Sequence, residues 1–200
     1  MNIYCDVSGG VGRGVMTLAA LAISQAQAEE TLAIFKGNTG IMGEVKGSRI
    51  DLAERALLFE LLAKTDFVAS VAVAISATKP APGDDRGDHD RAVYSALMAK
   101  AIESLIPRTT GCNHVMIDDG RYAPDVLEIV RADIGRIVGP FGLSHLEHSH
   151  SAAGLQIADV IANSFFNRAL PTDRQARMAA VVAPFLEDGR IRLSILTSDD

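Results

Sequence analysis

The chain has 200 residues, 48% hydrophobic, 22% charged and 5% aromatic, which predicts one domain with a sizeable core. Its 25 acidic residues against 19 Lys and Arg give a net charge of −6, which excludes binding of a long polyanion by bulk charge, so any nucleic-acid contact must be local. Two cysteines, Cys5 and Cys112, are too few for a disulfide framework or a cysteine zinc site, and favour a reducing, cytoplasmic location.

The first predicted element is a strand over residues 2–7, ended by Ser8-Gly9-Gly10, with Asp6 at its end. An apolar run over 15–25 predicts a second strand that forms a hairpin with the first. The glycine-rich segment between them is not a phosphate loop, because Val15 stands where that motif requires Lys. We expect a hairpin turn from which Arg13 projects.

Strands and helices alternate along the rest of the chain. Helices are predicted over 27–35, 51–64, 91–106, 123–138, 152–167 and 173–187, strands over 67–76, 114–117 and 143–150, an exposed loop over 79–90, and a short strand or tail at the end. This order predicts an α/β fold, a mixed sheet of antiparallel hairpin strands followed by parallel strands with helices on both faces. We expect one domain over 1–200, with 170–200 as a C-terminal helical extension.

The N-terminus has no basic and apolar leader, and no uncharged apolar run approaches the roughly 18 residues of a membrane span. We therefore expect a cytoplasmic protein with no membrane contact.

A carboxylate inside an apolar helix is the strongest anomaly of the sequence. Asp159 lies in the first half of the helix predicted over 152–167, and Gln156, Asp159 and Asn163 form one polar stripe on it. A buried carboxylate is costly unless it is paired, hydrogen-bonded or bound to a metal. The stripe predicts a lined site, and a buried ion pair of Asp159 with an Arg is the alternative.

The side chains of three aspartates could converge at one edge of the predicted sheet. Asp6 and Asp118 each end a predicted strand, and Asp159 lies on the apolar helix. Clustered carboxylates raise one another's pKa and favour Mg²⁺ or Mn²⁺ as a counter-ion. Taken singly, Asp6 would cap a turn and Asp118 would begin one.

The segment His145-Leu146-Glu147-His148-Ser149-His150 is typical of a metal cluster by composition. On a strand, His148 and His150 would share one face and His145 and Glu147 the other. We favour surface histidines without a metal, although a histidine pair next to an acidic centre could tune that centre.

Three segments resemble the domain of unknown function 3800 family, which belongs to the ribonuclease H-like superfamily. Ile3-Tyr4-Cys5-Asp6-Val7-Ser8-Gly9 is similar to its opening Asp-Glu-Ser-Gly strand, Gly43-Glu44-Val45-Lys46-Gly47 to its Glu-x-Lys segment, and Leu155-Gln156-Ile157-Ala158-Asp159 to its Gln-x-Ala-Asp helix. The resemblance spans residues 1–168. Val7 stands where the family has glutamate, so any role of that glutamate is lost.

The resemblance implies a ribonuclease H-like fold and a divalent-metal-dependent nuclease or phosphodiesterase. It implies Mg²⁺ or Mn²⁺ held by Asp6, Asp118 and Asp159, with Glu44 as a further catalytic carboxylate and Asp119 as the alternative to Asp118. Asp6 would bridge two cations. The residues implied to contact substrate are Lys46, Ser8, Arg13 and Gln156, with Arg49 as a further phosphate donor.

A catalytically inactive ribonuclease H-like module that binds a partner protein or nucleic acid is the competing interpretation. The missing glutamate, the negative net charge and the few aromatic residues favour it. A histidine-based hydrolase around His148 and His150 ranks last, because the sequence has no nucleophile elbow.

Overall fold

A computed structural model describes residues 2–75, 85–111 and 113–196 and contains a six-stranded sheet in the order β5-β4-β1-β2-β3-β6. β1 and β2 pair antiparallel, as do β2 and β3, whereas β4 runs parallel to β1, β5 to β4, and β6 to β3. The strands are β1 Asn2–Gly10, β2 Val15–Ile23, β3 Val68–Ile75, β4 Asn113–Asp118, β5 Gly142–Glu147 and β6 Ile191–Leu196. The predicted mixed sheet is confirmed.

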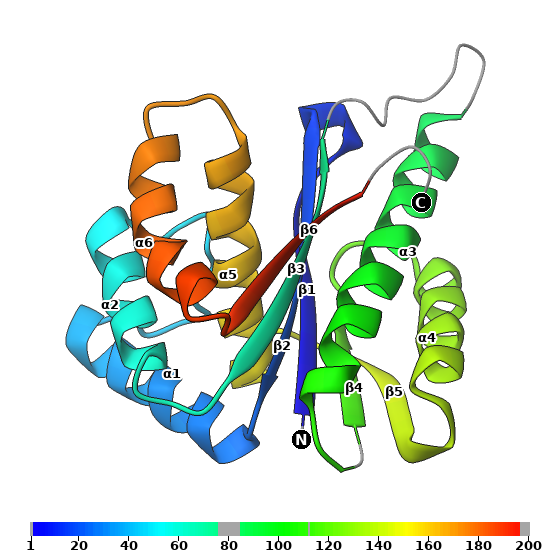
Figure 1. Ribbon diagram of the computed structural model, residues 1–200, viewed down its shortest axis with the longest axis horizontal. Helices are drawn as coiled ribbons and strands as arrows, with labels where there is room; N and C mark the ends of the chain where they lie inside the picture. The colour runs from blue at the N-terminus through cyan, green and yellow to red at the C-terminus, as the bar shows by residue number, and fades with distance from the viewer. Residues whose placement is uncertain (1, 76–84, 112, 197–200) are drawn as a thin grey trace.

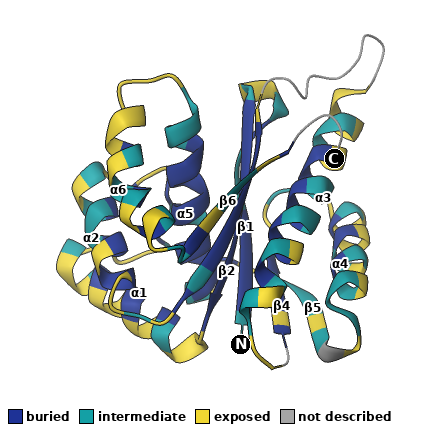
Figure 2. Cartoon of the chain, viewed as in Figure 1, coloured by how far each residue is buried: buried dark blue, intermediate teal, exposed yellow. Residues whose placement is uncertain are grey.

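Helices cover both faces of the sheet (Figure 1). One face carries α1 Gln25–Thr39, α2 Leu52–Leu62, α5 Ala153–Ala169 and α6 Gln175–Glu187, and the other carries α3 Arg86–Leu105 and α4 Pro124–Val138. Alternate residues of a strand point to opposite faces, so β1 contributes Tyr4 to one core and Ile3 and Cys5 to the other. Figure 2 shows the buried residues on the strands and on the helix sides that face them.

The predicted hairpin is confirmed, but its first strand is longer than expected. β1 continues through the glycines to Gly10, which pairs with Val15. Backbone hydrogen bonds of the ladder need no side chain, so pairing with β2 overrides the low strand propensity of glycine. Asp6 therefore lies within β1, opposite Ala19, and not at the strand's end. The turn is a 3₁₀ segment, Val11–Arg13, from which the exposed Arg13 projects.

The loop predicted over 79–90 is wrong for its last five residues. Residues 79–84 lie outside the described part of the chain, while α3 begins at Arg86 because the Asp85 side chain accepts hydrogen bonds from the N–H groups of Gly87 and Asp88. Asp90 is thus helical. Its carboxylate accepts a hydrogen bond from Val11 N at 3.0 Å and fixes the hairpin turn to α3.

The strand predicted over 143–150 is also too long. β5 ends at Glu147, so His148 and His150 follow the sheet and do not share a strand face. The Ser149 and His150 carbonyls instead accept hydrogen bonds from the buried Gln156 amide of α5, which takes the backbone out of the ladder.

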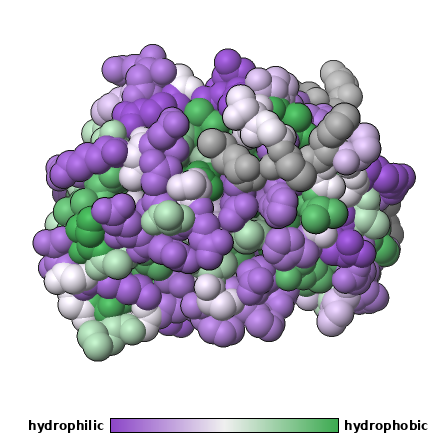
Figure 3. Space-filling model, turned by 90° about the horizontal axis from the view of Figure 1, so that it is seen from below, coloured by the Kyte–Doolittle hydropathy of each residue, from purple (hydrophilic) through white to green (hydrophobic). Residues whose placement is uncertain are grey.

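The residues after 170 supply α6 and then β6, which joins the sheet beside β3. Cys112 and residues 197–200 lie outside the described residues. Among the helices described, none combines the length and apolarity needed to cross a membrane. On the face seen from below, polar residues predominate and hydrophobic residues gather in small separate patches (Figure 3).

Candidate functional site

The sheet register places Asp6 and Asp118 side by side. The parallel pairing of β1 and β4 matches Cys5 with Ile117, and Asp6 and Asp118 are the next residue on each strand. Tyr4 and Met116, two residues earlier, pack in the core under α5. Because strand side chains alternate, Asp6 and Asp118 face the same side, toward α5.

Asp159 comes to this side of the sheet from α5. Its Oδ2 accepts a hydrogen bond from Gly47 N at 2.9 Å. No Arg lies within ion-pair distance of it in the described part of the chain, so the alternative of an Asp159–Arg ion pair is wrong for those residues.

The polar stripe of α5 binds segments that are distant in sequence. Gln156 is 3% exposed, its Oε1 accepts from Val45 N at 3.0 Å, and its Nε2 donates to Ser149 O at 3.0 Å. Asn163 Nδ2 donates to Ser8 Oγ at 3.0 Å. The stripe therefore holds the 43–47 segment and β1 against α5. Both polar atoms of the Gln156 amide already have protein partners.

The three aspartates are electrostatically linked. Asp6 is 6% exposed, and burial raises its pKa well above the ordinary value, with the Asp159 and Asp118 charges adding to the effect. Burial likewise raises the pKa of Asp159, against the Gly47 N–H and the Lys46 charge, which act to lower it. Asp118 Oδ1 is buried and has no hydrogen-bond partner in the described structure. Burial thus disfavours a negative charge on Asp6 and on Asp159.

Glu44, Lys46 and Ser149 form a network beside the aspartates. Lys46 Nζ lies 2.9 Å from Glu44 Oε1 and donates to Ser149 Oγ at 3.0 Å, and Ser149 donates to Glu44. Burial acts to lower the pKa of Lys46, but the hydrogen bond with Glu44 and the charges of Asp159 and Asp6 raise it overall. Lys46 is therefore a counter-charge to the aspartates, as well as a partner of Glu44.

Sequence reasoning missed Arg55, which fixes the 43–47 segment. Arg55 is 3% exposed and donates to Gly47 O at 2.5 Å and Asn163 Oδ1 at 3.0 Å. It also bonds Ser164 Oγ at 2.7 Å and Val160 O at 3.2 Å. The sequence signal for this role is an arginine within the largely apolar segment Leu52–Leu62.

The carboxylates suit a hard divalent cation by donor chemistry but not by their arrangement in this structure. Carboxylate oxygens are the ligands that Mg²⁺ and Mn²⁺ prefer, and the unpartnered Asp118 Oδ1 is an acceptor with unused capacity. Over residues 2–75, 85–111 and 113–196, no three His, Cys, Asp or Glu side chains stand close enough to hold one ion.

The remaining predicted residues lie around this centre at different distances. Ser8 is on β1, two residues after Asp6, whereas Arg13 is beyond the end of β1. The four residue-to-residue steps from Asp6 to Gly10 alone span about 13 Å at roughly 3.3 Å each. His148 Nδ1 lies 2.7 Å from the Asp119 carboxylate, and its ring stacks on His150 with centroids 5.4 Å apart.

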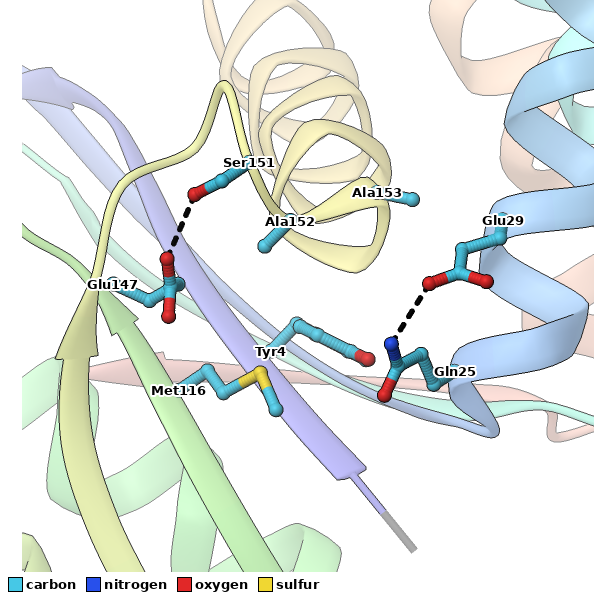
Figure 4. A pocket seen from close by; sticks show the side chains of 8 residues that line it. All are labelled: Tyr4, Gln25, Glu29, Met116, Glu147, Ser151, Ala152 and Ala153. Carbon is cyan, nitrogen blue, oxygen red and sulfur yellow. Dashed lines mark hydrogen bonds between the residues drawn. The ribbon is translucent and has the colours of Figure 1, made fainter.

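A cavity of about 230 Å³ opens on the same side of the sheet (Figure 4). Tyr4 and Met116 form its floor, two residues before Asp6 and Asp118 on the same strands. Glu147 and Ser151, joined by a hydrogen bond of 2.7 Å, line one side, and Gln25 and Glu29 of α1 line the other. Neither Asp6 nor Asp118 is among the residues that line the cavity.

Comparison with solved structures identifies the architecture. The structure of the PCNA:RNase HII complex from Archaeoglobus fulgidus matches with a TM-score of 0.56 and 15% sequence identity, over 96% of this chain and 89% of the other. No protein-family model matches the chain, and no curated protein matches it. At this identity the likeness concerns the fold. The chain has a ribonuclease H-like fold, a mixed sheet whose antiparallel hairpin strands are followed by parallel strands, with helices around it.

Proposed function

We propose that this protein is a divalent-metal-dependent nuclease or phosphodiesterase that acts on nucleic acid through Asp6, Asp118 and Asp159, with Glu44 as a fourth carboxylate. The observation that carries the proposal is the adjacent placement of Asp6 and Asp118 on β1 and β4, with the Asp159 charge close enough to raise the pKa of Asp6. Buried carboxylates with uncompensated charge are costly for stability and are typical of functional sites.

Mg²⁺ or Mn²⁺, when bound by Asp6, Asp118 and Asp159, would activate a water and stabilise the leaving oxygen of a phosphodiester. The chain's own residues prepare this site. Gly47 N–H orients the Asp159 carboxylate, and Gln156 positions the segment that carries Glu44 and Lys46.

Substrate contacts follow from the groups that surround the carboxylates. Lys46 offers an ammonium to a phosphate oxygen, at the expense of its bond with Glu44 or Ser149. Ser8 contributes a hydroxyl on the same side of β1 as Asp6. Arg13 can reach only a phosphate further along the bound nucleic-acid strand. Because the chain is acidic overall, binding rests on these local contacts.

The alternative, a catalytically inactive ribonuclease H-like binding module, has support of its own. The Asp159 carboxylate is bonded to Gly47 N–H, Lys46 already supplies a counter-charge, and no three metal-ligating side chains of the described residues are drawn together. In that case the carboxylate network would serve only to hold the 43–47 segment.

The test is cleavage of labelled single- and double-stranded DNA and RNA with Mn²⁺ or Mg²⁺ at millimolar concentration. We expect Asp6→Asn and Asp159→Asn each to lower turnover by at least about a hundredfold, the order of effect of removing one electrostatic group from a catalytic site. Asp66→Asn, at an exposed position after α2, is the matched control and should cleave like the wild type.

Thermal unfolding with and without the cations separates the two functions. Binding to the native state alone must stabilise it, so the nuclease predicts a metal-dependent rise in Tm that Asp6→Asn removes. Wild-type turnover in either variant would refute the catalytic role of that aspartate. No cleavage and no metal-dependent rise in the wild type would leave the binding module as the function.

A further inference from the structure

A second polar cavity lies among the helices α2, α5 and α6, away from Asp6, Asp118 and Asp159. It measures about 170 Å³, between five and six times the roughly 30 Å³ that one water occupies in the liquid. The beginning of α2, the end of α5 and the beginning of α6 enclose it, through Ile50, Asp51, Leu52, Arg55, Asn167, Arg174, Arg177 and Met178. Three of these residues are arginines, whereas Asp51 is the single carboxylate.

The arginines of this cavity outnumber its carboxylates. Arg174 and Arg177 are exposed and, within the described part of the chain, have neither an ion pair nor a side-chain hydrogen bond. Three residues apart at the beginning of α6, they lie on one side of that helix. Asp51 is the one carboxylate among the lining residues, and it also caps α2 by accepting from Glu54 N at 2.8 Å, so the three arginines exceed it by two positive charges.

Arg55 gives the cavity a buried cationic floor. It is 97% buried, and its Nε has no hydrogen-bond partner in the described structure, although both terminal nitrogens have theirs. Burial lowers the pKa of Arg55 to about 10, and the charge of Arg174 acts in the same direction, against that of Asp159. Arg55 and Arg174 therefore repel one another across a space whose lining carries three arginines and one carboxylate.

The N-terminus of α6 adds to the positive potential. This 13-residue helix begins at Gln175 without a side-chain cap beside the cavity, whereas the N-terminus of α2 is already capped by the carboxylates of Asp51 and Glu54. The N-terminus of a helix carries partial positive charge and free N–H groups that favour anions. Guanidinium groups match the oxygens of phosphate in pairs.

We propose that Arg55, Arg174 and Arg177, with the Asn167 side chain at their edge, form a binding site for a phosphate-class oxyanion. This proposal is independent of the proposed nuclease function, because Asp6, Asp118 and Asp159 do not line the cavity. Arg55 connects the cavity with these aspartates, because it donates to Gly47 O while Gly47 N donates to Asp159. The oxyanion is either free phosphate, including the phosphate of a nucleotide, or the backbone phosphate of a nucleic-acid strand.

The test is calorimetric titration of the full chain with inorganic phosphate, in EDTA so that no cleavage interferes. The wild type should bind saturably, and the double variant Arg174→Gln and Arg177→Gln should bind at least about tenfold more weakly, because it loses two charge-assisted contacts with the anion. Both side chains are exposed, so the double variant should keep the wild-type Tm. Arg192→Gln, exposed on β6, is the matched control and should bind like the wild type.

A parallel titration with an oligonucleotide that lacks terminal phosphates distinguishes the two sources. If the double variant loses oligonucleotide affinity and phosphate competes with the strand, the site takes backbone phosphate; if oligonucleotide binding is unchanged, it takes free phosphate. No saturable phosphate binding by the wild type, equal binding by the double variant, or an equal loss in Arg192→Gln would overturn the proposal.

Discussion

Gly47→Ala tests how tightly the 43–47 segment must lie against α5. A Cβ at this position would meet Asn163 Cβ at 2.6 Å, Asp159 O at 3.0 Å and Val160 Cα at 3.1 Å. Two of these atoms are backbone of a buried helix, and the third is fixed by the bonds of Asn163 to Ser8 and Arg55. None of the three can yield without moving α5 or the segment itself.

The distance by which the new Cβ is too close to its neighbours determines how much stability Gly47→Ala loses. Carbon atoms in contact are ordinarily about 3.5–4.0 Å apart, so the closest approach is about 1 Å too short. Overpacking of this kind costs about 1–3 kcal/mol, which lowers Tm by about 2–12 °C for a chain of this size. The segment should also shift away from Asp159, whose Oδ2 would lose the Gly47 N–H.

The assay is thermal and urea unfolding of the metal-free protein, with Gly43→Ala as the control. Gly43 lies in the same segment, and a Cβ there meets nothing within 4 Å. Gly43→Ala should therefore change the free energy of unfolding by no more than about 0.5 kcal/mol. If Gly47→Ala melts with the wild type, or if both variants lose equal stability, the close packing of this segment on α5 is refuted.

Three further predictions concern charge and backbone entropy. The folded pKa of Asp6 is raised, so the free energy of unfolding of the wild type in EDTA should fall as pH rises from the unfolded carboxyl range through the folded pKa. Asp6→Asn should lessen this fall and leave the part due to Asp159, whose pKa is also raised, and a variant less stable than the wild type at pH 8 would contradict the prediction. Arg55→Met should cost about 3 kcal/mol or more in urea unfolding because Gly47 O and Ser164 Oγ lose their Arg55 donor, while Val160 O and Asn163 Oδ1 keep only their other donors, Ser164 and Asn167; a loss below about 1 kcal/mol would argue against this role. Gly37→Ala, exposed in α1 with free space for a Cβ, should stabilise by about 0.5–1 kcal/mol, whereas a lower urea midpoint would show an unrecognised constraint.

The structure also alters the meaning of the net charge. The acidic excess argues against a broad electrostatic contact with nucleic acid, and it is measured over the whole chain. Arg55, Arg174 and Arg177 nevertheless converge on one cavity, and Asp6, Asp118 and Asp159 influence one another on the other side of α5. The fold thus gathers positive and negative side chains that are scattered along the sequence into two separate places.

Local chemistry was sufficient to predict most of the elements. The spacing of hydrophobic residues predicted the hairpin and the helices. The helix predicted from residue 51 is α2, which begins after the capping box formed by Asp51 and Glu54. The isolated Asp159 among apolar residues was a sufficient signal for a polar stripe on α5. These features depend on neighbours within a few residues, which is the range that a sequence pattern reports.

Tertiary contacts decided the rest. Gly9 and Gly10 extend β1 because β2 supplies the ladder partners, and Asp90 leaves the predicted loop for α3 and bonds Val11 N, 79 positions away. The 43–47 segment is held by Arg55 and by α5, more than 100 residues further on. Such contacts join groups without any regular sequence spacing, so the sequence alone determined which residues could meet at a site, and only the fold determined which of them do.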